Sequence, residues 1–172
     1  MVTPSPPRYL LRPANPYFIF LSLFLASMFN FMPWHQLFIP DMVALVLLFW
    51  NIRQPRKISI GTAVVLGLCM DVQNGVVLGQ HILAYSLMSF VAITLHRREL
   101  WLNRWVRGIY IIFLLLLPKL ICILLGLIIT GETPNWLYLS TAIIEVILWP
   151  WLSWLLLLPQ RRADEIDTVR PI

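Results

Sequence analysis

Residues 108–130 read GIYIIFLLLLPKLICILLGLIIT, and this stretch decides the fold class because Lys119 is its only charged residue. A helix needs about 20 apolar residues to cross a hydrocarbon core roughly 30 Å thick, and the stretch is long enough. Residues 136–158 form a second run of similar length, in which Glu145 is the only charge. The two runs predict a pair of transmembrane helices that are joined by the turn-forming residues 131–135.

Shorter apolar runs lie nearer the N-terminus. Residues 17–32 and 37–52 predict two further helices, and residues 58–95 can hold two short helices that turn around residues 73–79. The predicted fold class is therefore all-α, a polytopic integral membrane bundle of six transmembrane helices. Its length suits a single transmembrane domain, residues 1–172.

Basic residues set the predicted orientation. Twelve of the thirteen Lys and Arg residues lie between or beside the apolar runs, whereas the connections at 33–36, 73–75 and 131–135 contain none. Short cytoplasmic loops keep their basic residues, so both termini are predicted to be cytoplasmic. Residues 1–16 would form a short cytoplasmic segment, and residues 160–172 a disordered cytoplasmic tail. The clusters are Arg8 and Arg12; Arg53, Arg56 and Lys57; Arg97, Arg98, Arg104 and Arg107; and Arg161, Arg162 and Arg170.

Composition excludes several classes of protein. The chain is 59% hydrophobic and 12% charged, whereas about a quarter of the residues of a soluble domain are charged. Its net charge of +5 is spread over separate loops and termini, so nucleic acid binding is not expected. The sequence contains no metal-ligand spacing, phosphate-binding loop or nucleophile motif, so neither enzymatic activity nor a cofactor or metal site is predicted.

Four ionisable residues lie inside the predicted helices, where such residues are costly and usually face the bundle interior or a cavity. Lys119 lies about 16 Å from the outer end of its helix, and Glu145 about 14 Å from the outer start of the next. Similar depths predict an ion pair. We interpret it as a lock on the register of the two helices, with a proton or ion relay as the alternative. The other two residues are Asp41 and Asp71.

Three prolines within the predicted helices are expected to disturb the backbone. Asp41 follows Pro40, and its simplest interpretation is a carboxylate near the outer face that reaches water. A proline inside a helix removes one hydrogen bond and kinks the axis. The predicted kinks are at Pro40, Pro118 and Pro150.

The predicted outer turn between the third and fourth helices is rich in polar residues and glycine. Its glycines allow a tight turn and close helix approach, and its Asp and Asn side chains can bond the backbone groups that are freed where the third helix ends. The turn is either a docking or ligand site, or a capped hairpin. Its members are Asp71, Asn74, Gly75, Gly79 and His81.

The inner loop at residues 96–107 has aromatic residues at helical spacing opposite basic ones. The pattern suits a short helix in the interface plane, or an ordinary basic loop with aromatic anchors. Basic residues near the surface attract anionic lipids, so membrane lipids are expected partners. The helix would contain Trp101, Arg104, Trp105 and Arg107.

One part of the sequence is typical of a known family. Residues 58–85 read ISIGTAVVLGLCMDVQNGVVLGQHILAY and carry the pattern Asp-x-x-x-Gly-x-x-x-Gly at Asp71, Gly75 and Gly79. Together with PDMVALVLLFW at residues 40–50 and a late LWPW before a basic tail, the chain resembles the rod shape-determining protein MreD family.

The resemblance implies a non-enzymatic protein of the bacterial inner (cytoplasmic) membrane. Its expected partners are MreC above all, and MreB, RodZ, RodA and a penicillin-binding transpeptidase. The implied fold is similar to that of the substrate-binding S components of energy-coupling-factor transporters. The expected function is a scaffold that binds MreC and helps couple cytoskeletal filaments to peptidoglycan synthesis and rod shape. The alternative is a small-molecule-binding or transport protein with a polar intramembrane cavity.

Overall fold

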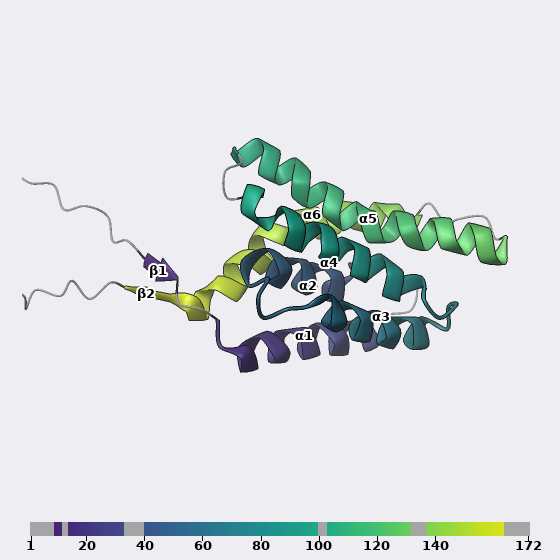
Figure 1. Cartoon of the computed structure of the whole chain (residues 1–172), viewed down its shortest axis with the longest axis horizontal. Helices are drawn as coiled ribbons and strands as arrows, with labels where there is room; N and C mark the ends of the chain where they lie inside the picture. Colours follow the sequence, from purple (N-terminus) through teal and green to yellow (C-terminus); the bar gives the residue numbers. More distant parts are fainter. Residues whose placement is uncertain (1–8, 12–13, 33–39, 100–102, 132–136, 164–172) are drawn as a thin grey trace, which may run out of the picture.

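The computed structural model describes residues 9–11, 14–32, 40–99, 103–131 and 137–163, and these form six α-helices and two short strands (Figure 1). The prediction of a helical chain with six helices is confirmed for this part of the sequence. The elements are β1 (Tyr9–Leu11), α1 (Pro16–Phe31), α2 (Met42–Arg53), α3 (Ile60–Asn74), α4 (Gln80–Glu99), α5 (Arg104–Thr130), α6 (Leu137–Leu157), the 3₁₀ turn η1 (Leu158–Gln160) and β2 (Arg161–Ala163).

Two helical segments are long and apolar enough to cross a membrane, Trp105–Thr130 and Tyr138–Gln160. Four shorter apolar helices accompany them, with 10 to 17 residues each. At 1.5 Å per residue, such helices are shorter than the roughly 30 Å of a bilayer core. The shorter segments are Pro16–Phe31, Met42–Arg53, Ile60–Asn74 and Gln80–Leu95.

Helix α2 is the centre of the bundle although it is the shortest of the six. Every residue from Val43 to Ile52 is buried, and α2 packs against α1, α4, α5 and α6. The outer surface, by contrast, is apolar: Phe20, Ile128 and Trp151 are 65%, 69% and 72% exposed. An apolar surface around a packed interior is the arrangement that a lipid environment favours.

Helices α3 and α4 form a tight hairpin. Gly75 ends α3 in the left-handed conformation with φ 61°, and Gly79 precedes α4 with φ 108°. The helices approach most closely at Gly67, where a Cβ atom would lie 2.6 Å from Ile82 Cα and 2.7 Å from the carbonyl oxygen of His81. Position 67 therefore requires glycine because a side chain would overlap the backbone of α4. Positions 75 and 79 favour glycine because their φ angles are positive.

The connections divide between the two ends of the bundle (Figure 1). One end holds β1, β2 and the link between α2 and α3, and the other holds the turn between α3 and α4. Strands β1 and β2 are antiparallel neighbours, with Leu10 opposite Arg162, so the N- and C-terminal segments lie side by side. Lys57 Nζ donates to the carbonyl oxygen of Ala14, which ties the link between α2 and α3 to the start of α1.

Three sequence predictions differ from the structure. Helix α2 begins at Met42 with Asp41 as its N-cap, so Pro40 lies outside the helix and does not kink it. A proline two residues before a helix is compatible with its start, because it need not supply a helical N–H. Pro118 and Pro150 do lie inside α5 and α6, and the kinks expected there stay predictions.

The prediction of a separate interfacial helix at residues 96–107 is also wrong. Arg104, Trp105 and Arg107 form the first turn of the 27-residue helix α5, while α4 extends to Glu99. Helix propagation from an existing turn is easier than nucleation of a new short helix. Trp101 lies outside the described residues. The tail expected to be disordered from residue 160 instead begins with the end of η1 and with strand β2.

Candidate functional site

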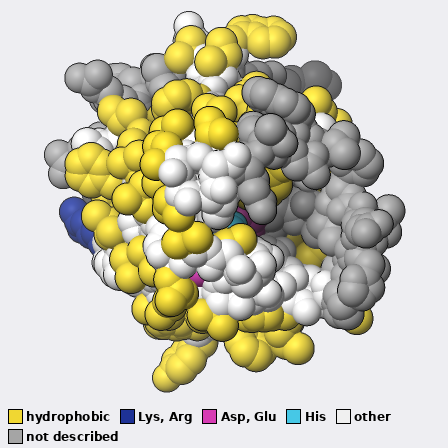
Figure 2. Space-filling model, turned by 90° about the vertical axis from the view of Figure 1, so that its right-hand side faces the viewer, with side chains coloured by type: hydrophobic (Ala, Val, Ile, Leu, Met, Phe, Trp, Pro, Cys, Tyr) yellow, Lys and Arg dark blue, Asp and Glu magenta, His cyan; other side chains and the backbone are white. Residues whose placement is uncertain are grey.

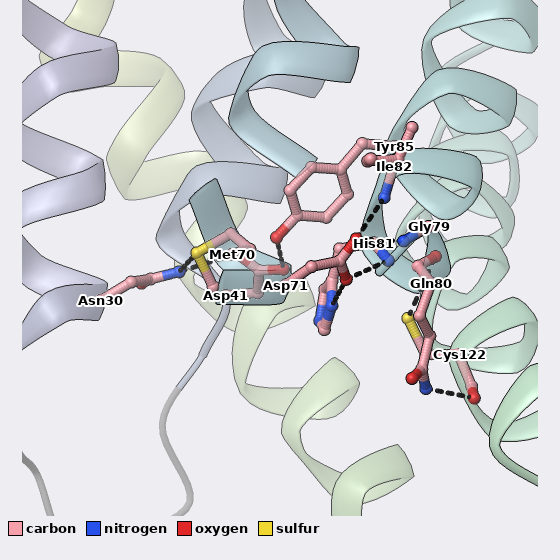
Figure 3. A network of polar contacts seen from close by, with 10 residues as sticks. All are labelled: Asn30, Asp41, Met70, Asp71, Gly79, Gln80, His81, Ile82, Tyr85 and Cys122. Atoms are coloured by element: carbon pink, nitrogen blue, oxygen red, sulfur yellow. Dashed lines mark hydrogen bonds and ion pairs between the residues drawn. The ribbon is translucent and has the colours of Figure 1, made fainter. Parts of the chain in front are cut away.

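Asp71 joins the end of α3 to the start of α4 (Figure 3). Its Oδ1 accepts from the backbone N–H of His81 at 2.7 Å and lies 2.9 Å from His81 Nδ1. Its Oδ2 accepts from the N–H groups of Gly79 at 2.8 Å and Ile82 at 3.4 Å. The first N–H groups of a helix have no intrahelical partner, so this carboxylate caps α4 and interacts favourably with its dipole.

The backbone of the same residue ends α3. The carbonyl oxygen of Asp71 accepts from the N–H groups of Gly75 and Val76, while its side chain is fully buried. Asn74, the last residue of α3, is exposed. The structure thus brings Asp71, Gly79 and His81 together, and it leaves Asn74 and Gly75 at the surface of the turn. This geometry is that of a capped hairpin.

Lys119 and Glu145 lie within contact distance between α5 and α6. Lys119 Nζ is 2.8 Å from Glu145 Oε1, and the two side chains are 2% and 1% exposed. The ammonium group also donates to Thr141 Oγ1 at 2.6 Å and lies 4.5 Å from the centre of the Tyr138 ring. Buried charges in proteins are paired and hydrogen-bonded, and this lysine has both kinds of partner and a cation–π contact.

Asp41 connects this ion pair to the other helices. Its backbone N–H donates to Glu145 Oε1 at 2.8 Å. Its Oδ1 accepts from Asn30 Nδ2 at 3.0 Å and from the N–H of Ala44, and its Oδ2 accepts from the hydroxyl of Tyr85. Asp41 is therefore only partly exposed and is tied into the bundle, in contrast to the expected carboxylate that simply reaches water.

These contacts form one connected set, which we call the buried polar network. Gln73 Nε2 completes it by donating to the carbonyl oxygen of Asn30. The ring of His81 meets that of Tyr85 edge to face, with centroids 5.8 Å apart, so the capped hairpin adjoins the network. One or more members come from each helix or its cap: Asn30, Asp41, Gln73, Tyr85, Lys119, Thr141 and Glu145.

Sequence reasoning missed the uncharged members of this network. Asn30 could have been noticed, because it is the one amide in a helix whose other polar side chains are two serines and a tyrosine. Tyr85 and Thr141 gave no such signal, because either residue type packs in membrane helices without special partners. Their role depends on which neighbouring side chain lies within reach.

The end of the bundle near the α3–α4 turn is hollowed. Figure 2 shows the colours of histidine and acidic side chains inside this hollow, below uncharged and apolar atoms. The described residues contain no group of three or more His, Cys, Asp or Glu side chains that could hold a metal ion.

The class of protein follows from the apolar surface and the buried polar interior: this is a helical membrane protein. The family model for rod shape-determining protein MreD matches residues 12–158, so the chain belongs to the MreD family and has a role in rod shape determination. It is 29% identical over 139 residues to the rod shape-determining protein MreD of Haemophilus influenzae, a match that covers 78% of this chain and 86% of that protein. No solved structure matches it significantly.

Proposed function

We propose that this protein is a non-enzymatic scaffold of the bacterial elongation machinery, embedded in the inner membrane. It binds MreC and helps couple cytoskeletal filaments to peptidoglycan synthesis. The observation that carries the proposal is the division of polar and apolar groups. Apart from Gln160, the described buried polar residues bond helices of the same chain to each other, and the outward faces are left apolar for contacts within the bilayer.

The proposed topology has six membrane crossings and two cytoplasmic termini. The side-by-side strands β1 and β2 support it, because an even number of crossings returns the chain to its starting side. Arg53 and Arg56 are exposed at the same end of the bundle, which agrees with the tendency of cytoplasmic loops to keep basic residues. The four shorter helices cross with the help of their connections and of local thinning of the bilayer.

Association with MreC is tested by co-purification in a mild detergent. The solubilised protein should be retained by tagged MreC and not by a tagged single-helix membrane protein of unrelated function. Retention by both baits, or by neither, would contradict a specific scaffold role. MreB, RodZ, RodA and a penicillin-binding transpeptidase can be tested as baits in the same way, and the proposal ranks them after MreC.

A second candidate function is small-molecule binding or transport. The hollow at the α3–α4 end, with histidine and acidic side chains inside it, favours this candidate. A similarity to the S components of energy-coupling-factor transporters, expected from the sequence, stays a prediction. Retention of a small molecule by purified protein that fails to bind MreC would favour this candidate over the scaffold.

A further inference from the structure

The buried polar network has more acceptors than donors. Glu145 Oε1 accepts from Lys119 and from the backbone of Asp41, whereas Glu145 Oε2 is buried and has no hydrogen-bond partner among the described residues. Gln73 Oε1, in the same network, is likewise buried without a partner. Buried acceptors are nearly always satisfied in proteins, so two unsatisfied oxygens in one network indicate a missing donor.

The charge of the network also indicates that a positively charged group is missing. Among the described residues, Asp41 and Glu145 contribute two carboxylates and Lys119 contributes one ammonium group, so the network carries one net negative charge when both carboxylates are ionised. The donors that the described residues supply to the carboxylate of Asp41 are neutral: the amide of Asn30, the backbone N–H of Ala44 and the hydroxyl of Tyr85. An uncompensated charge in such an environment is costly and favours the binding of a cation.

The two carboxylates of the network differ in exposure. Asp41 is partly exposed, whereas Glu145 is fully buried. Asp41 is therefore the carboxylate that a small group from outside the bundle contacts first.

We propose that the buried polar network binds a small organic cation with N–H donors, such as an alkylammonium or guanidinium group. The cation donates to Glu145 Oε2 and balances the charge that Lys119 leaves uncompensated. A quaternary ammonium ion has the charge but not the donor. A Ca²⁺ or Mg²⁺ ion needs six or more oxygen ligands, and the described residues contain no group of three acidic, His or Cys side chains for it. The inference does not depend on the scaffold role.

The test compares three salts on the purified protein at constant ionic strength, with thermal unfolding followed by tryptophan fluorescence. Methylammonium chloride should raise Tm by about 3 °C when it is near tenfold its dissociation constant. Sodium chloride and tetramethylammonium chloride should not. Equal effects of the three salts would overturn the proposal and leave the scaffold function untouched.

Variants assign the effect to the network. Glu145→Gln removes the charge and the free carboxylate oxygen, so the methylammonium shift should disappear. Asp41→Asn is the second variant, because it neutralises the net charge while leaving the Lys119–Glu145 pair in place. Ser89→Ala is the matched control, since Ser89 is a fully buried polar residue that bonds Asn51 away from the network. A folded Glu145→Gln or Asp41→Asn variant that keeps the full shift would overturn the proposal.

The same chemistry can come from a free amine or from a Lys or Arg side chain of a partner. Repeating the three-salt comparison on the complex with MreC distinguishes these sources. A methylammonium shift that persists in the complex assigns the site to a free ligand. A shift that disappears only in the complex assigns it to a side chain of the partner.

Discussion

Lys119 Nζ and Glu145 Oε1 lie 2.8 Å apart in the interior of the bundle, where they connect the two longest helices. The backbone N–H of Asp41 donates to the same oxygen, so the pair is also connected to the N-cap of α2. A buried ion pair adds little net stability, because desolvation offsets much of the attraction, whereas removing one partner leaves a costly buried charge. We therefore expect each single substitution in the pair to destabilise the protein more than the double substitution does.

Lys119→Met and Glu145→Gln should each destabilise the protein by about 3–5 kcal/mol, because each leaves an uncompensated buried group. The double variant should recover part of this loss, because it leaves no buried charge at the pair. Reversible unfolding in detergent, combined into a double-mutant cycle, measures the coupling. Single variants that accumulate to wild-type levels and unfold at the wild-type midpoint would show that the contact is unimportant.

Asp71→Asn should weaken the α3–α4 hairpin by about 1–3 kcal/mol. The asparagine has one acceptor oxygen in place of two, and its amino group would face backbone N–H groups that now donate to Oδ2. Amide hydrogen exchange should increase selectively in the first turn of α4. Asn74→Ala is the control, because Asn74 is exposed three residues away and its loss should change stability by less than about 0.5 kcal/mol. Equal effects of the two substitutions would contradict the capping role.

Gly67→Ala should destabilise the protein by about 1–3 kcal/mol, because its methyl group would overlap the backbone of α4 at Ile82. Gly108→Ala offers the opposite case in α5, where nothing lies within 4 Å of the added carbon. There the higher helix propensity of alanine should increase stability by up to about 1 kcal/mol. Thermal unfolding of the two variants compares the signs, and a stabilised Gly67→Ala variant would disprove the close approach of α3 and α4.

Cysteine labelling tests the topology. In a variant with Cys69 and Cys122 replaced by alanine, a cysteine at Asn74 should react with an impermeant maleimide added to intact cells. A cysteine at Arg56 should react only after permeabilisation, because basic loops stay cytoplasmic. Both positions are exposed, so burial does not limit the reaction. Labelling of position 56 in intact cells would contradict the proposed orientation.

The hairpin and the ion pair differ in how far the sequence predicted them. The turn between α3 and α4 could be predicted because Gly75 and Gly79 act locally, through backbone conformations open to glycine. The capping of α4 by Asp71 was less accessible, since the carboxylate was expected to serve the helix that contains it. The interfacial helix at residues 96–107 was predicted from spacing alone, and spacing does not reveal that α5 begins at Arg104.

Sequence by itself determined that this is a helical membrane protein with segregated basic residues, because apolar runs and loop charges act on the chain locally. A helix satisfies its own backbone hydrogen bonds, so its existence in a bilayer needs no knowledge of its neighbours. The tertiary structure alone decided that Asp41 meets Glu145, 104 positions away, and that Asn30 and Tyr85 meet Asp41. Those contacts depend on the rotation and depth of each helix, which the packing of all six sets together.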